Sequence, residues 1–342
     1  MLRAMVRKQK PTLADIARTA GVSIATVSRA LSEPRLVQPE TLRKIQSVAS
    51  GLGYMPNRRA RALVSGRSNT IGVAVPTLNS PIFSACLHEM QKAFSTEGYQ
   101  LLIASHEYDP KAEAAALAQL VSHGVDGLIV VGAERPKSTW ALIANADVPL
   151  VQLWEGVDAH DRVLVDNHRA GREIAQHVLA LGHRRIGVIS GVLSNNDRQQ
   201  ARLAGIRAAL ADAGLALPRS MISEQPLSIA AGRSGSAMLL ELMPPPSAII
   251  GTIDLLAIGG MIEAQGRGIK VPAEISFAGI DNVDMAAHVA PSLTTIDMPA
   301  ASIGAEAAAM MLRRLDRPAG SKAQCTHLPI NLVVRRSTAA VG

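Results

Sequence analysis

The stretch TLADIARTAGVSIATVSRAL, residues 12–31, contains the clearest local pattern in the chain. Small and aliphatic side chains recur at helical spacing over residues 13–20 and again over residues 24–31. Between the two runs, Gly21 can adopt the positive φ that ends a helix, and Ser23 can cap the helix that follows. The sequence therefore predicts two short helices around a tight turn, which is a helix-turn-helix.

The second predicted helix has small side chains on the side opposite its apolar residues. Ile24 and Ala25 begin that side, and Arg29 adds a cation about one turn later. A recognition helix contacts the major groove with residues near its start, and side chains of this size leave room for it to enter. The pattern therefore indicates DNA binding.

Positive charge is concentrated near the N-terminus. Residues 1–70 contain 13 Lys or Arg and 3 Asp or Glu, whereas the rest of the chain contains 22 and 25. The N-terminal part thus has a formal charge of +10 and the remainder −3, within a total of +7. A local basic excess of this kind is typical of a surface that binds a polyanion.

Two further segments complete the predicted N-terminal head. Apolar spacing over residues 39–52 predicts a third helix, so we expect residues 10–56 to form a helix-turn-helix domain. The basic segment 57–64 that follows is too short to be a stable helix alone. Because its charges repel one another until phosphate neutralises them, we expect residues 57–69 to be a hinge helix and linker that fold on DNA.

From residue 70 onward, short Val- and Ile-rich runs alternate with Ala- and Leu-rich helical stretches. Continuous apolar runs such as 71–75, 127–131 and 248–251 are typical of parallel strands covered on both faces. The number of these units predicts an α/β core of two doubly wound parallel-sheet lobes over residues 70–336. Ligands bind such folds beyond the carboxyl ends of the strands, so we expect the site in a cleft between the lobes.

Several function classes are not supported by the sequence. It has no run of about 18 apolar residues and no apolar signal core, so we expect a cytoplasmic protein without membrane contact. Cys86 and Cys325 lie outside any paired-cysteine motif and the histidines lack ligand spacing, so no metal or cofactor is predicted. No Gly-rich phosphate loop or Gly-x-Ser-x-Gly motif occurs, which argues against an enzyme.

Six short motifs are spread over most of the chain. They are LADIA, GVS and TVSR within residues 13–29, GYMPNR at 53–58, GVDGLI at 124–129, GHRRIG at 182–187, RLAG at 202–205 and PSLTTI at 291–296. In this order they resemble the LacI/GalR family of bacterial transcription regulators. The resemblance implies a homodimeric repressor with a periplasmic-binding-protein-like effector core, a palindromic operator and a sugar-type effector. Because no leucine heptads follow residue 336, we expect a dimer rather than a coiled-coil tetramer.

The resemblance also implies which residues contact DNA. Ile24, Ala25 and Arg29 match base-reading positions, and the first two suit methyl contacts with thymine. Leu63 matches a hinge leucine that wedges into the minor groove and kinks the duplex. The positions expected to contact phosphate or the DNA backbone are Thr12, Ser23, Thr26, Ser28 and Asn57, to which the basic segment adds Arg58 and Arg61.

Polar residues of the core match the family's effector site. Arg202 and Asp281 match positions that hold sugar hydroxyls. Arg198 precedes Arg202 by one helical turn, and two arginines on one helix face would suit a carboxylate. Ile253 stands where the family usually has a ligand-binding asparagine, so one hydroxyl contact is lost.

Three further residues complete the expected effector site. Asn79 and Phe83 follow the first core strand, and Trp154 ends another. Residues 106–110, together with Trp154 and Glu155, resemble the gluconate-operon branch of the family. We therefore expect a sugar acid such as gluconate, its 2-keto form or a phosphorylated relative.

Alternative interpretations remain open at this point. The core alone resembles a solute-binding or sensor protein, although the basic head favours a regulator. Arg198 and Arg202 could instead form surface ion pairs, and Phe83 and Trp154 could be packing residues. The direction of the effector's action, release or promotion of DNA binding, is also open.

Overall fold

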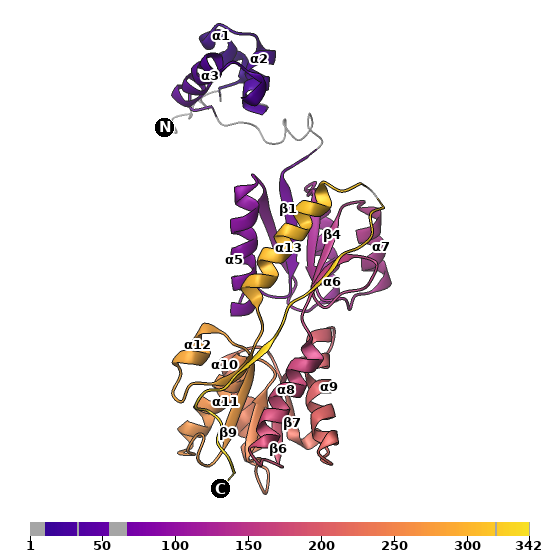
Figure 1. Ribbon diagram of the computed structural model, residues 1–342, viewed down its shortest axis with the longest axis vertical. Coiled ribbons are helices and arrows are strands. Elements are labelled where there is room, and N and C mark those ends of the chain that lie inside the picture. Colours follow the sequence, from indigo (N-terminus) through magenta and orange to yellow (C-terminus); the bar gives the residue numbers. More distant parts are fainter. Residues whose placement is uncertain (1–10, 33, 55–66, 319, 342) are drawn as a thin grey trace, which may run out of the picture. The chain divides into compact units, whose positions relative to one another are not determined.

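The computed structural model describes residues 11–32, 34–54, 67–318 and 320–341 (Figure 1). The chain divides into two compact units, residues 1–68 and residues 69–342. Four residues expected to contact DNA lie outside the described residues; they are Asn57, Arg58, Arg61 and Leu63.

The first unit contains a group of short helices. They are α1 (Leu13–Ala20), α2 (Ile24–Ser32), the 3₁₀ turn η1 (Pro34–Leu36) and α3 (Pro39–Gly51). Thr12 caps α1, because its Oγ1 accepts from the Asp15 backbone N–H at 3.3 Å while the Asp15 carboxylate accepts from the Thr12 N–H at 2.9 Å. Gly21 ends α1 at a φ of 66°, and Ser23 Oγ accepts from the Thr26 N–H at 3.0 Å. Both predictions about the turn are confirmed.

Aliphatic side chains from these helices form the core of the head. The buried members are Ile16, Ala17, Ala20, Val27, Ala30, Ile45 and Ala49. Because Val27 and Ala30 direct one side of α2 into this core, its opposite side faces solvent.

The second unit contains two lobes, each built on a six-stranded sheet. The strands of the first are β1 (Thr70–Val75), β2 (Gln100–Ser105), β3 (Gly127–Val131), β4 (Leu150–Trp154), β5 (Asp161–Leu164) and β11 (Cys325–His327). The strands of the second are β6 (Ile186–Gly191), β7 (Ile222–Gln225), β8 (Ala248–Gly251), β9 (Ser276–Asp281), β10 (Thr294–Asp297) and β12 (Asn331–Val333). Their orders correspond, β11-β5-β4-β3-β1-β2 and β12-β10-β9-β8-β6-β7.

Helices cover both sheets. The first lobe contains α5 (Pro81–Thr96), α6 (Pro110–Ser122), α7 (Lys137–Asn145) and α13 (Ala300–Leu315). The second contains α8 (Asn167–Ala180), α9 (Asp197–Asp212), the 3₁₀ turn η2 (Arg219–Met221), α10 (Ile229–Leu240), α11 (Asp254–Gly266) and α12 (Asp284–His288). Every residue of β3, β4, β6, β8 and β9 is buried, as expected for strands covered on both faces. The prediction of two doubly wound parallel lobes is confirmed; β12, which pairs antiparallel with β10, is the exception to the parallel pairing.

The C-terminal part of the chain visits both lobes (Figure 1). After β10, helix α13 and strand β11 return to the first lobe, and β12 then joins the second. Ser337 is buried beyond residue 336, where its Oγ donates to the Phe277 carbonyl at 2.6 Å. The packed core therefore continues past residue 336. Within the described ranges, no helix combines the length and hydropathy needed to cross a membrane.

Candidate functional site

A pocket lies between the two lobes, beyond the carboxyl ends of their parallel strands. Its lining comes from the first lobe (Ser80, Ile82, Phe83, Tyr108 and Trp154) and from the second (Asn196, Arg198, Gln199, Arg202, Leu227, Ile253 and Asp281). Five of the six residues expected at the effector site are among them. The sixth, Asn79, is exposed and does not line this pocket.

A buried ion pair forms the polar part of the second-lobe wall. Arg202 Nη1 lies 2.9 Å from Asp281 Oδ1, and both side chains are buried. Arg202 also donates to the Thr252 carbonyl at 2.8 Å and to Asn167 Oδ1 at 3.0 Å. The alternative of a surface ion pair is therefore wrong for Arg202. Burial raises the pKa of Asp281, and the adjacent Arg202 guanidinium opposes that rise.

Asp281 Oδ1 retains its capacity to accept a hydrogen bond. Among the described residues its contact is the ion pair with Arg202 Nη1 at 2.9 Å. Because an ionised carboxylate oxygen can accept more than one hydrogen bond, it has capacity left for a donor in the pocket. A ligand hydroxyl would supply that donor.

Close packing of α8 against α9 places Arg202. A Cβ added at Gly171 would lie 1.9 Å from the Arg202 carbonyl oxygen, and one added at Gly205 would lie 1.9 Å from the His168 carbonyl oxygen. Both contacts would be clashes, so glycine at these positions lets the two helix backbones approach. The motif beginning at residue 202 thus contains both a pocket-lining arginine and the glycine that positions it.

The first-lobe wall is largely aromatic. Phe83 and Trp154 pack edge to face, with ring centroids 5.1 Å apart and an interplanar angle of 86°. Trp154 ends β4 at a φ of 65°, in the left-handed region that few side chains adopt. Both residues are buried, and each has two roles, since it packs against the other ring and also lines the pocket.

Asp254 supports the polar wall from behind. It is fully buried at the start of α11, where its Oδ1 accepts from the Thr295 hydroxyl at 2.5 Å and its Oδ2 from the Val283 N–H at 2.9 Å. Burial, helped by the nearby charge of Asp281, raises the pKa of Asp254 to about 7. The sequence analysis gave this residue no role, although it lies shortly after the buried strand β8.

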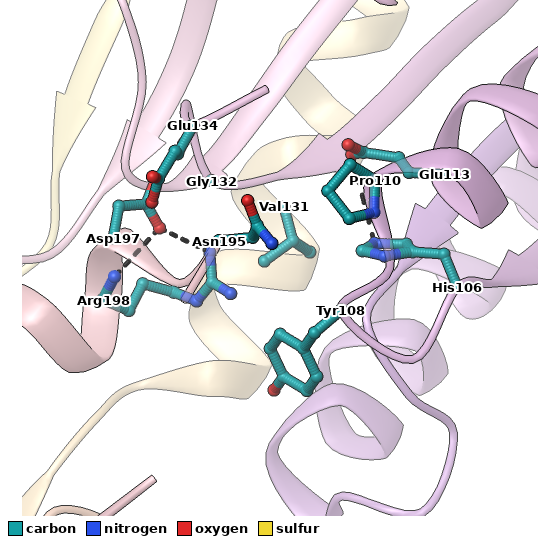
Figure 2. Close-up of a pocket in the computed structure, with 10 residues that line it drawn as sticks. All are labelled: His106, Tyr108, Pro110, Glu113, Val131, Gly132, Glu134, Asn195, Asp197 and Arg198. Carbon is teal, nitrogen blue, oxygen red and sulfur yellow. Dashed lines mark hydrogen bonds and ion pairs between the residues drawn. The ribbon is translucent and has the colours of Figure 1, made fainter. Parts of the chain in front are cut away.

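Asp197 links the two lobes beside the pocket (Figure 2). Its Oδ2 accepts from the backbone N–H groups of Ala133 at 2.6 Å and Glu134 at 3.2 Å, both in the first lobe. Its Oδ1 accepts from Arg198 Nη1 at 2.8 Å, and Arg198 is buried, so the surface-pair alternative is wrong here too. A Cβ on Gly132 would lie 2.4 Å from that nitrogen, so a larger residue there would displace the Arg198 guanidinium.

The DNA-binding positions expected in α2 lie on its solvent side. Ile24 is 53% exposed, Ala25, Ser28 and Arg29 are exposed, and Thr26 is half-buried. This side of the helix is therefore accessible to a partner.

Comparison with known proteins identifies the family. Residues 12–57 match the family described as bacterial regulatory proteins, lacI family, and residues 175–338 match a periplasmic binding protein-like domain. The chain belongs to the LacI family of bacterial regulatory proteins, and it is therefore a DNA-binding transcription regulator.

Individual relatives share most of their length with this chain. It is 35% identical over 334 residues to the HTH-type transcriptional regulator DegA of Bacillus subtilis, with 96% of this chain and 98% of DegA covered. It is 31% identical over 312 residues to the HTH-type transcriptional regulator GntR of Escherichia coli, with 91% and 93% covered. A crystal structure of the lac repressor dimer bound to operator and the anti-inducer ONPF matches with a TM-score of 0.84 and 27% identity, covering 97% and 100%.

These relationships confirm the resemblance inferred from the six motifs. They also confirm the expectation of a transcription regulator rather than an enzyme, because the relatives carry regulator names over nearly their full length.

Proposed function

We propose that the protein is a homodimeric repressor of a palindromic operator and that a sugar acid in the pocket between the lobes controls its affinity for DNA. The observation that carries the proposal is the buried ion pair of Arg202 with Asp281 Oδ1 on the pocket wall, because the carboxylate oxygen can accept a further hydrogen bond from a ligand. The orientation of Asp281 is stabilised by Arg202, which the protein holds through Thr252 and Asn167. Such preorganised polar groups orient a ligand in an otherwise apolar pocket.

The head supplies the proposed DNA contacts. Ile24, Ala25 and Arg29 read bases in the major groove. The similarity to a lac repressor dimer bound to operator supports operator binding by this head. The proposed phosphate contacts are Thr12, Ser23, Thr26, Ser28, Asn57, Arg58 and Arg61, and Leu63 is the proposed minor-groove wedge. Residues 10–56, 57–69 and 70–336 are the proposed domain, hinge and effector core. Since bacterial operators lie in the cytoplasm, we place the protein there.

Arg198 is the proposed partner of the effector's carboxylate. Two donor atoms of Arg202, Nε and Nη1, are engaged with Asn167, Thr252 and Asp281. Arg198 also lines the pocket and has five N–H groups. One of them, on Nη1, donates to Asp197. We therefore assign the effector's carboxylate to Arg198 alone, rather than to Arg198 and Arg202 together.

The function can be tested with purified protein and an operator selected from random DNA. Fluorescence anisotropy should show tight binding to a palindromic sequence, and D-gluconate should change the affinity whereas D-glucose should not. A response only to neutral sugars would contradict the sugar-acid proposal. Failure to select any DNA sequence would contradict operator binding.

A single substitution tests the pocket within the same assay. Asp281→Ala should leave operator binding of the ligand-free protein intact and abolish the response to the effector. Asp284→Ala is the matched control, because its carboxylate is 98% exposed in the same lobe and should respond as wild type does. Joint loss of DNA binding and response in Asp281→Ala would show that the residue is structural instead.

A further inference from the structure

A second hollow lies on the first-lobe side of Arg198 and contains an unusual buried histidine (Figure 2). His106 follows β2 and is only 8% exposed. Over the described ranges of the chain, neither Nδ1 nor Nε2 of His106 has a hydrogen-bond partner. Because buried polar atoms are rarely left in this state, the ring requires a partner from outside these residues.

The nearest acidic group is not available to His106. Glu113 Oε1 lies 4.0 Å from His106 Nε2, which is too long for a hydrogen bond. The same oxygen accepts from Arg135 Nε at 3.0 Å and Nη2 at 2.9 Å. Arg135 is held in turn by the carbonyls of Gly132 and Val131. Glu113 would have to break this buried network in order to reach the histidine.

The chemistry of the hollow selects an uncharged group that both donates and accepts. Burial lowers the pKa of His106, which favours the neutral ring with one donor nitrogen and one acceptor nitrogen. Glu113 beside the ring is already paired with Arg135, so the group that meets His106 has no charge to neutralise there. The lining around His106 therefore suits a hydroxyl.

The hollow has room for a hydroxyl. Its volume is about 20 Å³, and roughly 10–15 Å³ is enough for one water-sized group. Tyr108 and Arg198 line both this hollow and the pocket that contains Asp281, so the two spaces are neighbours. A ligand bound at Arg198 can therefore reach His106.

We propose that His106 is a specificity-determining residue that binds a hydroxyl of the effector. The inference rests on the proposed function, in which Arg198 holds the acid's carboxylate. It goes further by assigning the first-lobe residue that meets a hydroxyl of that acid.

Isothermal titration calorimetry on the full-length protein tests this inference, with D-gluconate as the probe. Loss of one or two hydrogen bonds in His106→Ala should weaken D-gluconate binding by about tenfold, which corresponds to 1.4 kcal/mol. His106→Gln retains a donor and an acceptor and should recover part of the affinity. His123→Ala, at an exposed histidine of the same lobe, should bind as wild type does.

One result would overturn the inference while leaving the proposed function intact. It is equal affinity of wild type and His106→Ala for D-gluconate, since the hollow would then hold only water. Failure of the proposed effector class looks different, because wild type would then not bind D-gluconate; that result would overturn both proposals.

Discussion

The two lobes share one strand order but contribute differently to the pocket. The second lobe supplies an ion pair, Arg202 with Asp281, whose arginine is held by surrounding protein groups. The first lobe supplies the aromatic pair Phe83 and Trp154, and in the adjoining hollow it buries His106 without a hydrogen-bond partner among the described residues. The same architecture thus builds two different walls. The second-lobe wall has charges whose positions are set before a ligand binds. The first-lobe wall is apolar and lies beside a buried histidine ring without a hydrogen-bond partner among the described residues. Four substitutions break or sharpen this comparison.

Arg202→Ala should have the largest effect. It leaves the buried Asp281 carboxyl without its counter-charge, and breaking a buried pair in this way costs about 3 to 5 kcal/mol of unfolding free energy. Urea denaturation followed by circular dichroism measures the loss. Arg207→Ala, at an exposed position of the same helix, should change stability by less than about 0.5 kcal/mol. Equal effects of the two substitutions would show that the ion pair does not stabilise the second-lobe wall.

Asp254 should make the stability of the second lobe depend on pH. Its pKa is about 7 in the folded protein against an ordinary value of 3.8, so between these pH values the folded state binds more protons than the unfolded state. The free energy of unfolding should therefore fall as pH rises from about 4 to 7. Asp254→Asn should flatten this dependence, as measured by the denaturation midpoint at pH 5 and pH 7.5. Asp284→Asn, at an exposed carboxylate, should leave the pH dependence unchanged. If Asp254→Asn also left it unchanged, the titration would belong to other groups.

Gly132→Ala tests the contact that joins the lobes. Gly132 and Gly124 both have positive φ, 80° and 70°, so alanine should cost about 1 kcal/mol of backbone strain at either position. A Cβ at Gly132 would also press on Arg198, whereas at Gly124 none of the described atoms lies within 4 Å. We expect an additional loss of about 1 to 3 kcal/mol and weaker effector binding for Gly132→Ala alone. Thermal unfolding and calorimetry measure both; equal behaviour of the two variants would contradict a tight contact between the lobes.

Gln200→Ala should have the smallest effect. Its Nε2 joins the lobes by donating to Glu134 Oε2 at 3.0 Å, but the bond is exposed. Water replaces such a bond readily, so the stability should change by no more than about 0.5 kcal/mol. A loss as large as that of Gly132→Ala would show that exposed contacts, rather than the buried Asp197 region, join the lobes.

The helix-turn-helix and the strands were predictable because their signals are local. Thr12, Gly21 and Ser23 act on backbone groups within a few residues, so their spacing in the sequence is also their spacing in the structure. Arg202 and Asp281 were identified through motifs of a known family. Asp197 was not identified, because its first-lobe partners lie 63 and 64 residues away and no periodicity brings them together.

His106 also shows what the sequence does not reveal. The histidines lack metal-ligand spacing in the sequence, and only the fold shows that Glu113, the acidic group nearest to His106, is already bound by Arg135. Asn79 was expected to line the pocket from its position after β1, yet the loop leaves it exposed. Position after a strand indicates which edge of a sheet a residue occupies, but not whether its side chain faces the pocket.

The amino-acid sequence by itself determined the helix-turn-helix, the α/β character of both lobes and the family of the protein. These properties depend on helical or strand periodicity and on short motifs, all of which are read along the chain. The tertiary structure alone decided which charges neutralise one another, which glycines allow close approach and which buried groups still need a partner. Such properties depend on distances of a few ångströms between residues far apart in sequence, and on a burial that exists only once the lobes have packed.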